Sequence, residues 1–151
     1  MKKMNIEHLY RQVIMEHYKY PENKGLVSDE NYLLIHFKNP SCGDDVRVQL
    51  LVENNMIKDI KHEGSGCSIC CSSASVASVT LKGKTVKEAN LIIKEFYELV
   101  KGEAFNNEIL KGDALAYQGV SKFPARIRCA TLAWNALEQG IEKEMEEENG
   151  R

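Results

Sequence analysis

The feature that most constrains the fold is a strand-like hydrophobic period in the middle of the chain. Over residues 46–52 an apolar side chain stands at every second position, which is the period of a β-strand with one buried face. The two asparagines at 54–55 follow, and asparagine tolerates the positive φ of a tight hairpin turn. Segments 32–37 and 56–62 supply the flanking strands. The sequence therefore predicts a small three-stranded antiparallel sheet.

Helical periods lie on both sides of this sheet. Apolar residues recur at helical spacing over 6–18, before the strands. After the glycine-rich sequence 64–66, Ser68 can cap a helix that runs to about Lys82, with Gly83 at its end. That helix is rich in small residues, which allow a neighbouring element to approach closely: Ser72, Ser73, Ala74, Ser75, Ala77 and Ser78.

The last third of the chain is also helical. A capping box at Thr85 begins a helix that Gly102 ends. Short helical turns are expected within 103–122, and Pro124 suits the first position of the final helix. The order helix, sheet, then helices predicts an α+β fold, in which the small antiparallel sheet packs against several helices.

Length and charge narrow the classes of function. The 151 residues predict one domain over 1–151, and the formal net charge of −2 argues against a dedicated nucleic-acid binder. No apolar run is long enough for a membrane span. The polar start of the chain does not resemble a secretory signal, which predicts a cytoplasmic protein. The acidic segment 138–151 is expected to be a solvated, frayed helical tail.

The cysteines carry the chemical information. There are five, and an odd number without an export signal argues against a disulfide framework. Cys42 lies in the loop between the first two predicted strands, Cys67 just before a helix, and Cys129 in the first turns of the last helix. Side chains at element ends can converge from distant parts of a sequence. Asp44 can then supply a fourth ligand to a tetrahedral zinc site.

The surroundings of these cysteines predict thiolates. A helix N-terminus next to Cys67, and Arg126 and Arg128 next to Cys129, are both expected to lower a thiol pKa. The spacing is only moderately specific, because buried cysteines also act as small hydrophobic residues. Cys70 and Cys71 are expected to be such packing residues.

Other patterns are weaker. Cys67 and Cys70 have the spacing of a redox pair, but no βαβ pattern precedes them. The histidines do not cluster, and His62 is expected to be an exposed strand residue. Asp44 and Asp45 make a poor acid–base pair, because adjacent strand residues face opposite sides. No nucleophile triad, P-loop or dinucleotide fingerprint is present.

The sequence resembles the SufU/IscU/NifU N-terminal domain family of iron–sulfur cluster assembly proteins. The similarity covers nearly the whole chain and is carried by residues 9–18, 23–25, 39–44, 64–69 and 119–129. Two features resemble its SufU branch. Scaffold members have a histidine where this chain has Arg128, and they have a shorter stretch between the second and third cysteines.

In that branch, the resemblance implies zinc bound by Cys42, Asp44, Cys67 and Cys129. It also implies sulfur delivered by a pyridoxal-phosphate-dependent cysteine desulfurase of the SufS type, with Cys42 as the acceptor. Arg126 matches a family arginine near the site. Downstream iron–sulfur assembly proteins are the implied recipients of the sulfur. Whether the chain counts as an enzyme stays open, with sulfurtransferase the preferred activity.

Two alternatives also stay open. A scaffold can assemble a [2Fe-2S] cluster, or bind iron, on the same ligands. A non-catalytic module stapled by zinc would only bind a partner, and loss of zinc would then unfold it. Cys70 and Cys71 depart from the family pattern, and they would permit a ligand swap or a second persulfide site.

Overall fold

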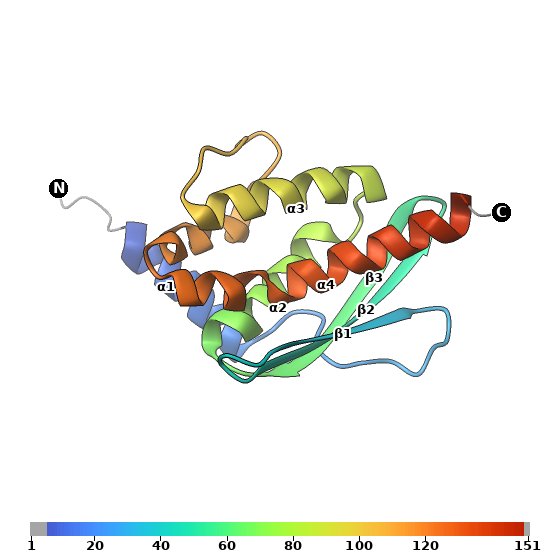
Figure 1. The fold of residues 1–151 in the computed structure, drawn as a ribbon, viewed down its shortest axis with the longest axis horizontal. Coiled ribbons are helices and arrows are strands. Elements are labelled where there is room, and N and C mark those ends of the chain that lie inside the picture. Colours follow the sequence, from blue (N-terminus) through green and yellow to red (C-terminus); the bar gives the residue numbers. More distant parts are fainter. Residues whose placement is uncertain (1–5, 150–151) are drawn as a thin grey trace.

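A computed structural model of the chain describes residues 6–149. Four α-helices, three strands and one 3-10 helix follow one another along this part of the chain (Figure 1). In chain order they are α1 (Ile6–Lys19), β1 (Leu33–Asn39), β2 (Asp44–Glu53), β3 (Met56–Ser65), α2 (Ser68–Leu81), α3 (Val86–Lys101), η1 (Gly112–Lys122) and α4 (Pro124–Asn149).

The sheet is the predicted antiparallel meander. Its order is β1-β2-β3, and Val48 in the central strand pairs with Ile35 on one side and His62 on the other. Asn54 and Asn55 form the turn between β2 and β3 with φ angles of 54° and 63°, which confirms the left-handed turn expected there. β1 and β3 each extend further than predicted, to Asn39 and Ser65.

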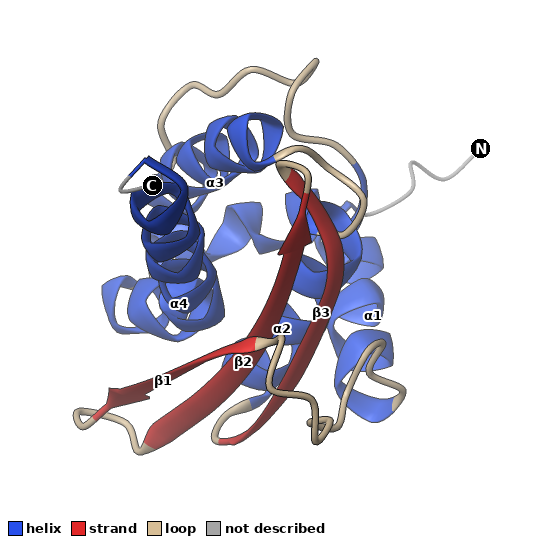
Figure 2. Ribbon diagram, turned by 90° about the vertical axis from the view of Figure 1, so that its right-hand side faces the viewer, coloured by secondary structure: helices blue, strands red, loops and turns tan. Residues whose placement is uncertain are grey.

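Helices cover the sheet and one another. Helix α4 packs on β1 and β2, and α3 packs on α4. In Figures 1 and 2, α4 accordingly lies between α3 and the sheet. Helix α2 contacts α1, α4 and β3. The core thus forms where α2 and α4 meet, and the α+β prediction is confirmed.

The small residues of α2 do what the sequence predicts. Ser72 to Ser78 are all buried, so α1 and α4 can both approach the helix closely. The Trp134 Nε1–H donates to Ser73 Oγ at 2.9 Å, and Ser73 Oγ donates to the Ala130 carbonyl at 2.6 Å. These bonds join α2 to α4.

The ends of the helices follow local signals, with one correction. Cys67, not Ser68, is the N-cap of α2, and it makes no side-chain cap bond. The capping box at Thr85, the left-handed Gly102 and the start of α4 at Pro124 are as predicted. The helical turns expected within 103–122 are the 3-10 helix η1.

Two expectations concern the ends of the chain. The polar start falls mainly on residues 1–5, and the last two residues of the acidic segment are 150 and 151; both lie outside the described residues. Helix α4 continues to Asn149, and fraying of this end stays a prediction. Within the described residues, no helix combines the length and apolar character needed to cross a bilayer.

Candidate metal centre

The turn between β1 and β2 presents Cys42. The backbone N–H groups of Cys42 and Gly43 donate to the Asn39 carbonyl at 3.3 and 2.9 Å, and Gly43 has a φ of 72°. Asn39 Nδ2 donates to Cys42 Sγ at 2.9 Å. Asn39 is buried, whereas Cys42 is exposed. The buried Asn39 therefore fixes the turn, and the turn presents the Cys42 sulfur to solvent.

Asp44, the first residue of β2, is the buried anion of the site. It is 1% exposed. Its Oδ1 accepts the Cys67 backbone N–H at 3.0 Å, and its Oδ2 accepts the Cys42 thiol at 3.0 Å. Burial opposes ionisation, but the bonds from Cys129, Cys42 and Cys67 hold the pKa of Asp44 below its ordinary value. The carboxylate is thus kept ionised.

Three of the four ligand positions expected from the sequence meet at one site, and the fourth borders it. The Sγ atoms of Cys42 and Cys129 lie 3.3 Å apart. The ligand atoms of Cys42, Asp44 and Cys129 all lie within 4.8 Å of one another. Cys67 borders this group, with its Sγ 4.0 Å from Asp44 Oδ2. The starts of β2 and α2 and the first turns of α4 therefore converge on one point.

The acidity expected of Cys129 is wrong. Burial, followed by hydrogen bonding to Asp44, raises the pKa of this thiol. Cys129 is 1% exposed, whereas Arg126 and Arg128 are exposed, so water screens their charges. Arg126 does interact with the site, because the charge of Cys67 and a hydrogen bond to Cys129 raise the pKa of its guanidinium.

Cys70 and Cys71 separate into two environments. Cys70 is fully buried in the core, which agrees with the packing prediction, and burial raises its pKa. Cys71 is half-buried, and its Sγ donates to the Gly66 carbonyl at 3.8 Å. It lines a pocket, so packing alone does not describe it. Neither joins the group formed by Cys42, Asp44 and Cys129.

The prediction for His62 is also wrong. The residue is 4% exposed, and its Nε2 donates to the Glu22 carbonyl at 2.7 Å. The chain after α1 folds back over β3, as the bridge between Lys24 and His62 shows, and this long-range contact buries the ring. Asp45 behaves as expected: it points away from Asp44 and pairs with His36 at 2.6 Å.

Two residues of the site were not singled out from the sequence. Asn39 marked only the end of a strand, although its amide holds the Cys42 sulfur. Gly66 marked only a turn, although a Cβ on it would meet the Asp44 carboxylate. The signal for Gly66 was its place immediately before a cysteine at a helix start, and the signal for Asn39 was its place in the stretch 39–44, which carries part of the family resemblance.

Comparison with known proteins identifies the family. The NifU-like N-terminal domain matches residues 9–149. The zinc-dependent sulfurtransferase SufU of Bacillus subtilis is 46% identical over 93% of this chain and 94% of its own. The iron–sulfur cluster assembly scaffold protein IscU of Streptococcus pyogenes is 35% identical over 91% of this chain and 86% of its own.

Solved structures agree. A protein of Fervidobacterium islandicum, described as a candidate scaffold for iron–sulfur cluster assembly in the SUF system, superposes with a TM-score of 0.79 at 31% identity. The superposition covers 87% of this chain and 96% of that one. This chain belongs to the NifU-like N-terminal domain family, and its similarity is greater to SufU than to the IscU scaffold.

Proposed function

We propose that this chain is a zinc-dependent sulfur-transfer protein of iron–sulfur cluster assembly. It would accept sulfur from a pyridoxal-phosphate-dependent cysteine desulfurase of the SufS type on Cys42. The observation that carries the proposal is the meeting of Cys42, Asp44 and Cys129, with Cys67 beside them, at one end of the molecule. The SufU relative, named as a zinc-dependent sulfurtransferase, supports it.

The donor set suits zinc. Three sulfur atoms and one carboxylate are ligands that Zn²⁺ takes in a four-coordinate site. Asp44 is already ionised and hydrogen-bonded, as a metal-ligating carboxylate usually is. Bound zinc would hold the thiols of Cys42, Cys67 and Cys129 as thiolates, which offsets the effect of burial on Cys129.

Cys42 is the best placed acceptor. It is exposed on a turn, whereas Asp44 and Cys129 are almost completely buried. The Cys42 thiolate would attack the terminal sulfur of a persulfide on the desulfurase. The S–S bond of that persulfide breaks as the new bond forms, and the donor cysteine leaves as a thiolate. Asn39 and Arg126 supply a hydrogen bond and a positive charge at the site.

Metal content is the first test. We expect about one zinc per chain and no acid-labile sulfide in protein purified without oxygen. Iron with matching sulfide would instead support the scaffold function, which the relationship to IscU keeps as the second candidate. A site that works through thiolates would suit the reducing cytoplasm, and downstream assembly proteins would receive the sulfur.

The Cys42→Ala variant tests the acceptor. We expect it to abolish stimulation of the desulfurase, because no other site thiol is as exposed. Cys71→Ser is the matched control, and it should stimulate like the unaltered protein. Desulfurase turnover measured as sulfide release is the readout, and full stimulation by Cys42→Ala would refute the assignment.

A further inference from the structure

A pocket separate from the metal centre lies on the other side of Gly66. Its volume is about 260 Å³, and its lining includes Tyr18 from α1, Lys24, His62 from β3, and Cys71 from α2. Cys71 Sγ contacts the Gly66 carbonyl, whereas the Asp44 carboxylate lies where a Cβ on the same glycine would stand. One residue therefore separates the two sites.

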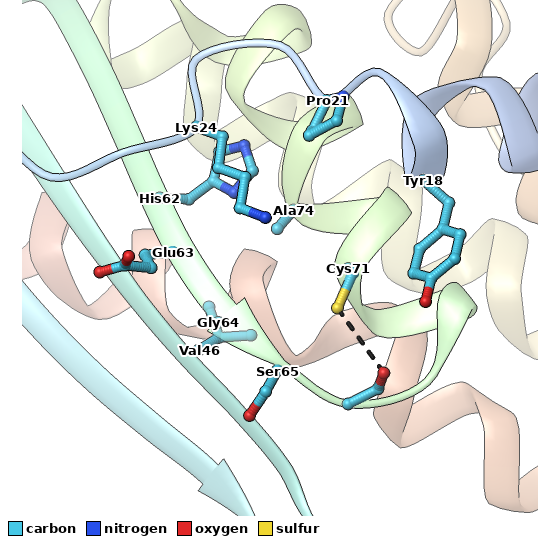
Figure 3. A pocket seen from close by; sticks show the side chains of 11 residues that line it. Tyr18, Pro21, Lys24, Val46, His62, Glu63, Gly64, Ser65, Cys71 and Ala74 are labelled. Atoms are coloured by element: carbon cyan, nitrogen blue, oxygen red, sulfur yellow. Dashed lines mark hydrogen bonds between the residues drawn. The ribbon is translucent and has the colours of Figure 1, made fainter.

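The polar groups of this pocket lie at two ends, with Lys24 and His62 at one and Cys71 at the other. Figure 3 shows Lys24 beside the His62 ring, with its ammonium directed toward the space in front of Ala74 and Cys71. The exposed side chains of Tyr18 and Lys24 leave the space open to solvent. A cation therefore stands at one end and a thiol at the other, while the carboxylate of Glu63, which also lines the pocket, points away from both.

His62 adds an unused acceptor. Nε2 must carry its hydrogen, because its partner is a carbonyl oxygen. Burial also favours the neutral ring by lowering the pKa of His62. Nδ1 is then an acceptor, and it has no hydrogen-bond partner within the described part of the chain. The residue is only 4% exposed, and it lines the pocket.

These three groups define a ligand. Lys24 suits a carboxylate, and His62 Nδ1 suits the N–H of an ammonium group. In an α-amino acid both groups are attached to one carbon, which fits the adjacency of Lys24 and His62. The volume lies below the about 300–1,000 Å³ of pockets for drug-sized ligands, so the ligand is small. Its third contact is the Cys71 sulfur.

We propose that this pocket binds a small zwitterionic disulfide of the amino-acid type, and that Cys71 forms a mixed disulfide with it. The Cys71 sulfur attacks one sulfur of the ligand, whose S–S bond breaks. The second half leaves as a thiolate and takes up the proton that Cys71 releases. The disulfide itself is the oxidant, so no other co-reactant is required.

Capture by the pocket drives this reaction. Cys71 is half-buried, its Sγ lies on the Gly66 carbonyl and it lines the pocket, so the pocket is the approach that the structure offers to a disulfide. The charged disulfide must therefore be held in the pocket, against the sulfur. Discrimination between charged and uncharged disulfides is the property that distinguishes the proposal from simple exposure of a cysteine.

The test uses zinc-loaded full-length protein with L-cystine, and 2-hydroxyethyl disulfide as the uncharged probe. Mass spectrometry with peptide mapping should find one cysteinyl group on Cys71. The adduct should be absent in Cys71→Ser and present in Cys70→Ser. Lys24→Gln should slow the reaction with cystine about tenfold more than the reaction with the uncharged probe, the effect of losing one charge-assisted bond.

This test is independent of the proposed sulfur transfer, because the adduct on Cys71 is measured without a desulfurase. Modification that spares Cys71 would overturn the proposal. So would equal rates of modification by the two probes, or an unchanged cystine rate in Lys24→Gln. Circular dichroism of each variant checks that it is folded.

Discussion

Single residues set the shape of the metal centre. Gly66 has a φ of 144° and lies against the Asp44 carboxylate, so this position has no room for a Cβ. Asn39 holds the Cys42 sulfur from the base of its turn. Outside the metal centre, His62 in β3 ties the segment after α1 to the sheet. Each of these three residues acts through one close contact: Gly66 with Asp44, Asn39 with Cys42, and His62 with the Glu22 carbonyl.

Gly66→Ala should weaken zinc binding. The new methyl group would push Asp44 away from Cys42 and Cys67, and we expect at least a tenfold loss of zinc affinity, or about 1.4 kcal/mol. Competition with a chromogenic chelator measures it. Gly83→Ala is the control, because Gly83 also has a positive φ but has nothing within 4 Å of a Cβ. Equal affinities in the two variants would contradict this account.

His62 should make stability fall with acidity. Burial, helped by Lys24 and Lys61, lowers the pKa of His62 from 6.5 despite the opposing bond to Glu22. The unfolded chain then binds a proton more readily than the folded chain. The stabilisation is complete above pH 6.5 and is lost as the pH falls through the lowered folded value.

Urea unfolding at pH 7.5 and pH 5.5 measures this effect. His62→Gln should lose less stability between the two pH values than the unaltered protein does. His36→Gln, at an exposed position on β1, is the control. An equal loss in His62→Gln and the unaltered protein would show that His62 does not carry the pH dependence.

At the scale of elements, the packing of α2 on α4 places two of the thiols. Cys67 caps α2 and Cys129 lies near the start of α4, so their separation depends on how these helices meet. Ser73 connects them through Trp134 and Ala130. Trp134 also stacks on Phe96 of α3, with ring centroids 3.9 Å apart. Trp134 of α4 is thus held by α2 through Ser73 and by α3 through Phe96.

Ser73→Ala should destabilise the fold by about 1–3 kcal/mol, because it leaves the buried Trp134 N–H without an acceptor. Thermal and urea unfolding measure the change. Val79→Ala, at a half-exposed position on the same helix, is the control and should cost less. A Ser73→Ala variant as stable as the unaltered protein would show that the bond is not important.

The whole molecule has a core that does not depend on the metal. Its largest fully buried side chains include Trp134, Tyr117 and Phe96, which belong to α4, η1 and α3. The proposed ligands instead join element ends at one edge. The site therefore lies on a fold that has its own hydrophobic stabilisation.

Removal of zinc should leave the chain folded. We expect chelation to retain the far-ultraviolet circular dichroism spectrum and to lower Tm, because zinc stabilises only the folded state. Desulfurase stimulation should be lost at the same time and return with zinc. Loss of the spectrum on chelation would instead favour the zinc-stapled binding module.

The sequence alone determined the elements and the candidate ligands. Strand alternation, the asparagine turn, the Thr85 capping box and Pro124 act within a few residues, so they can be interpreted locally. The positions of Cys42, Cys67 and Cys129 at element ends predicted their convergence, because such ends can meet.

Only the tertiary structure decided what surrounds each side chain. Cys70 and Cys71 are neighbours in sequence, but a rotation of about 100° around α2 places one in the core and the other at a pocket. The burial of His62 comes from a segment about 40 residues earlier in the chain, and the raised pKa of Cys129 from packing around it. Desolvation depends on contacts between distant segments, which no local pattern specifies.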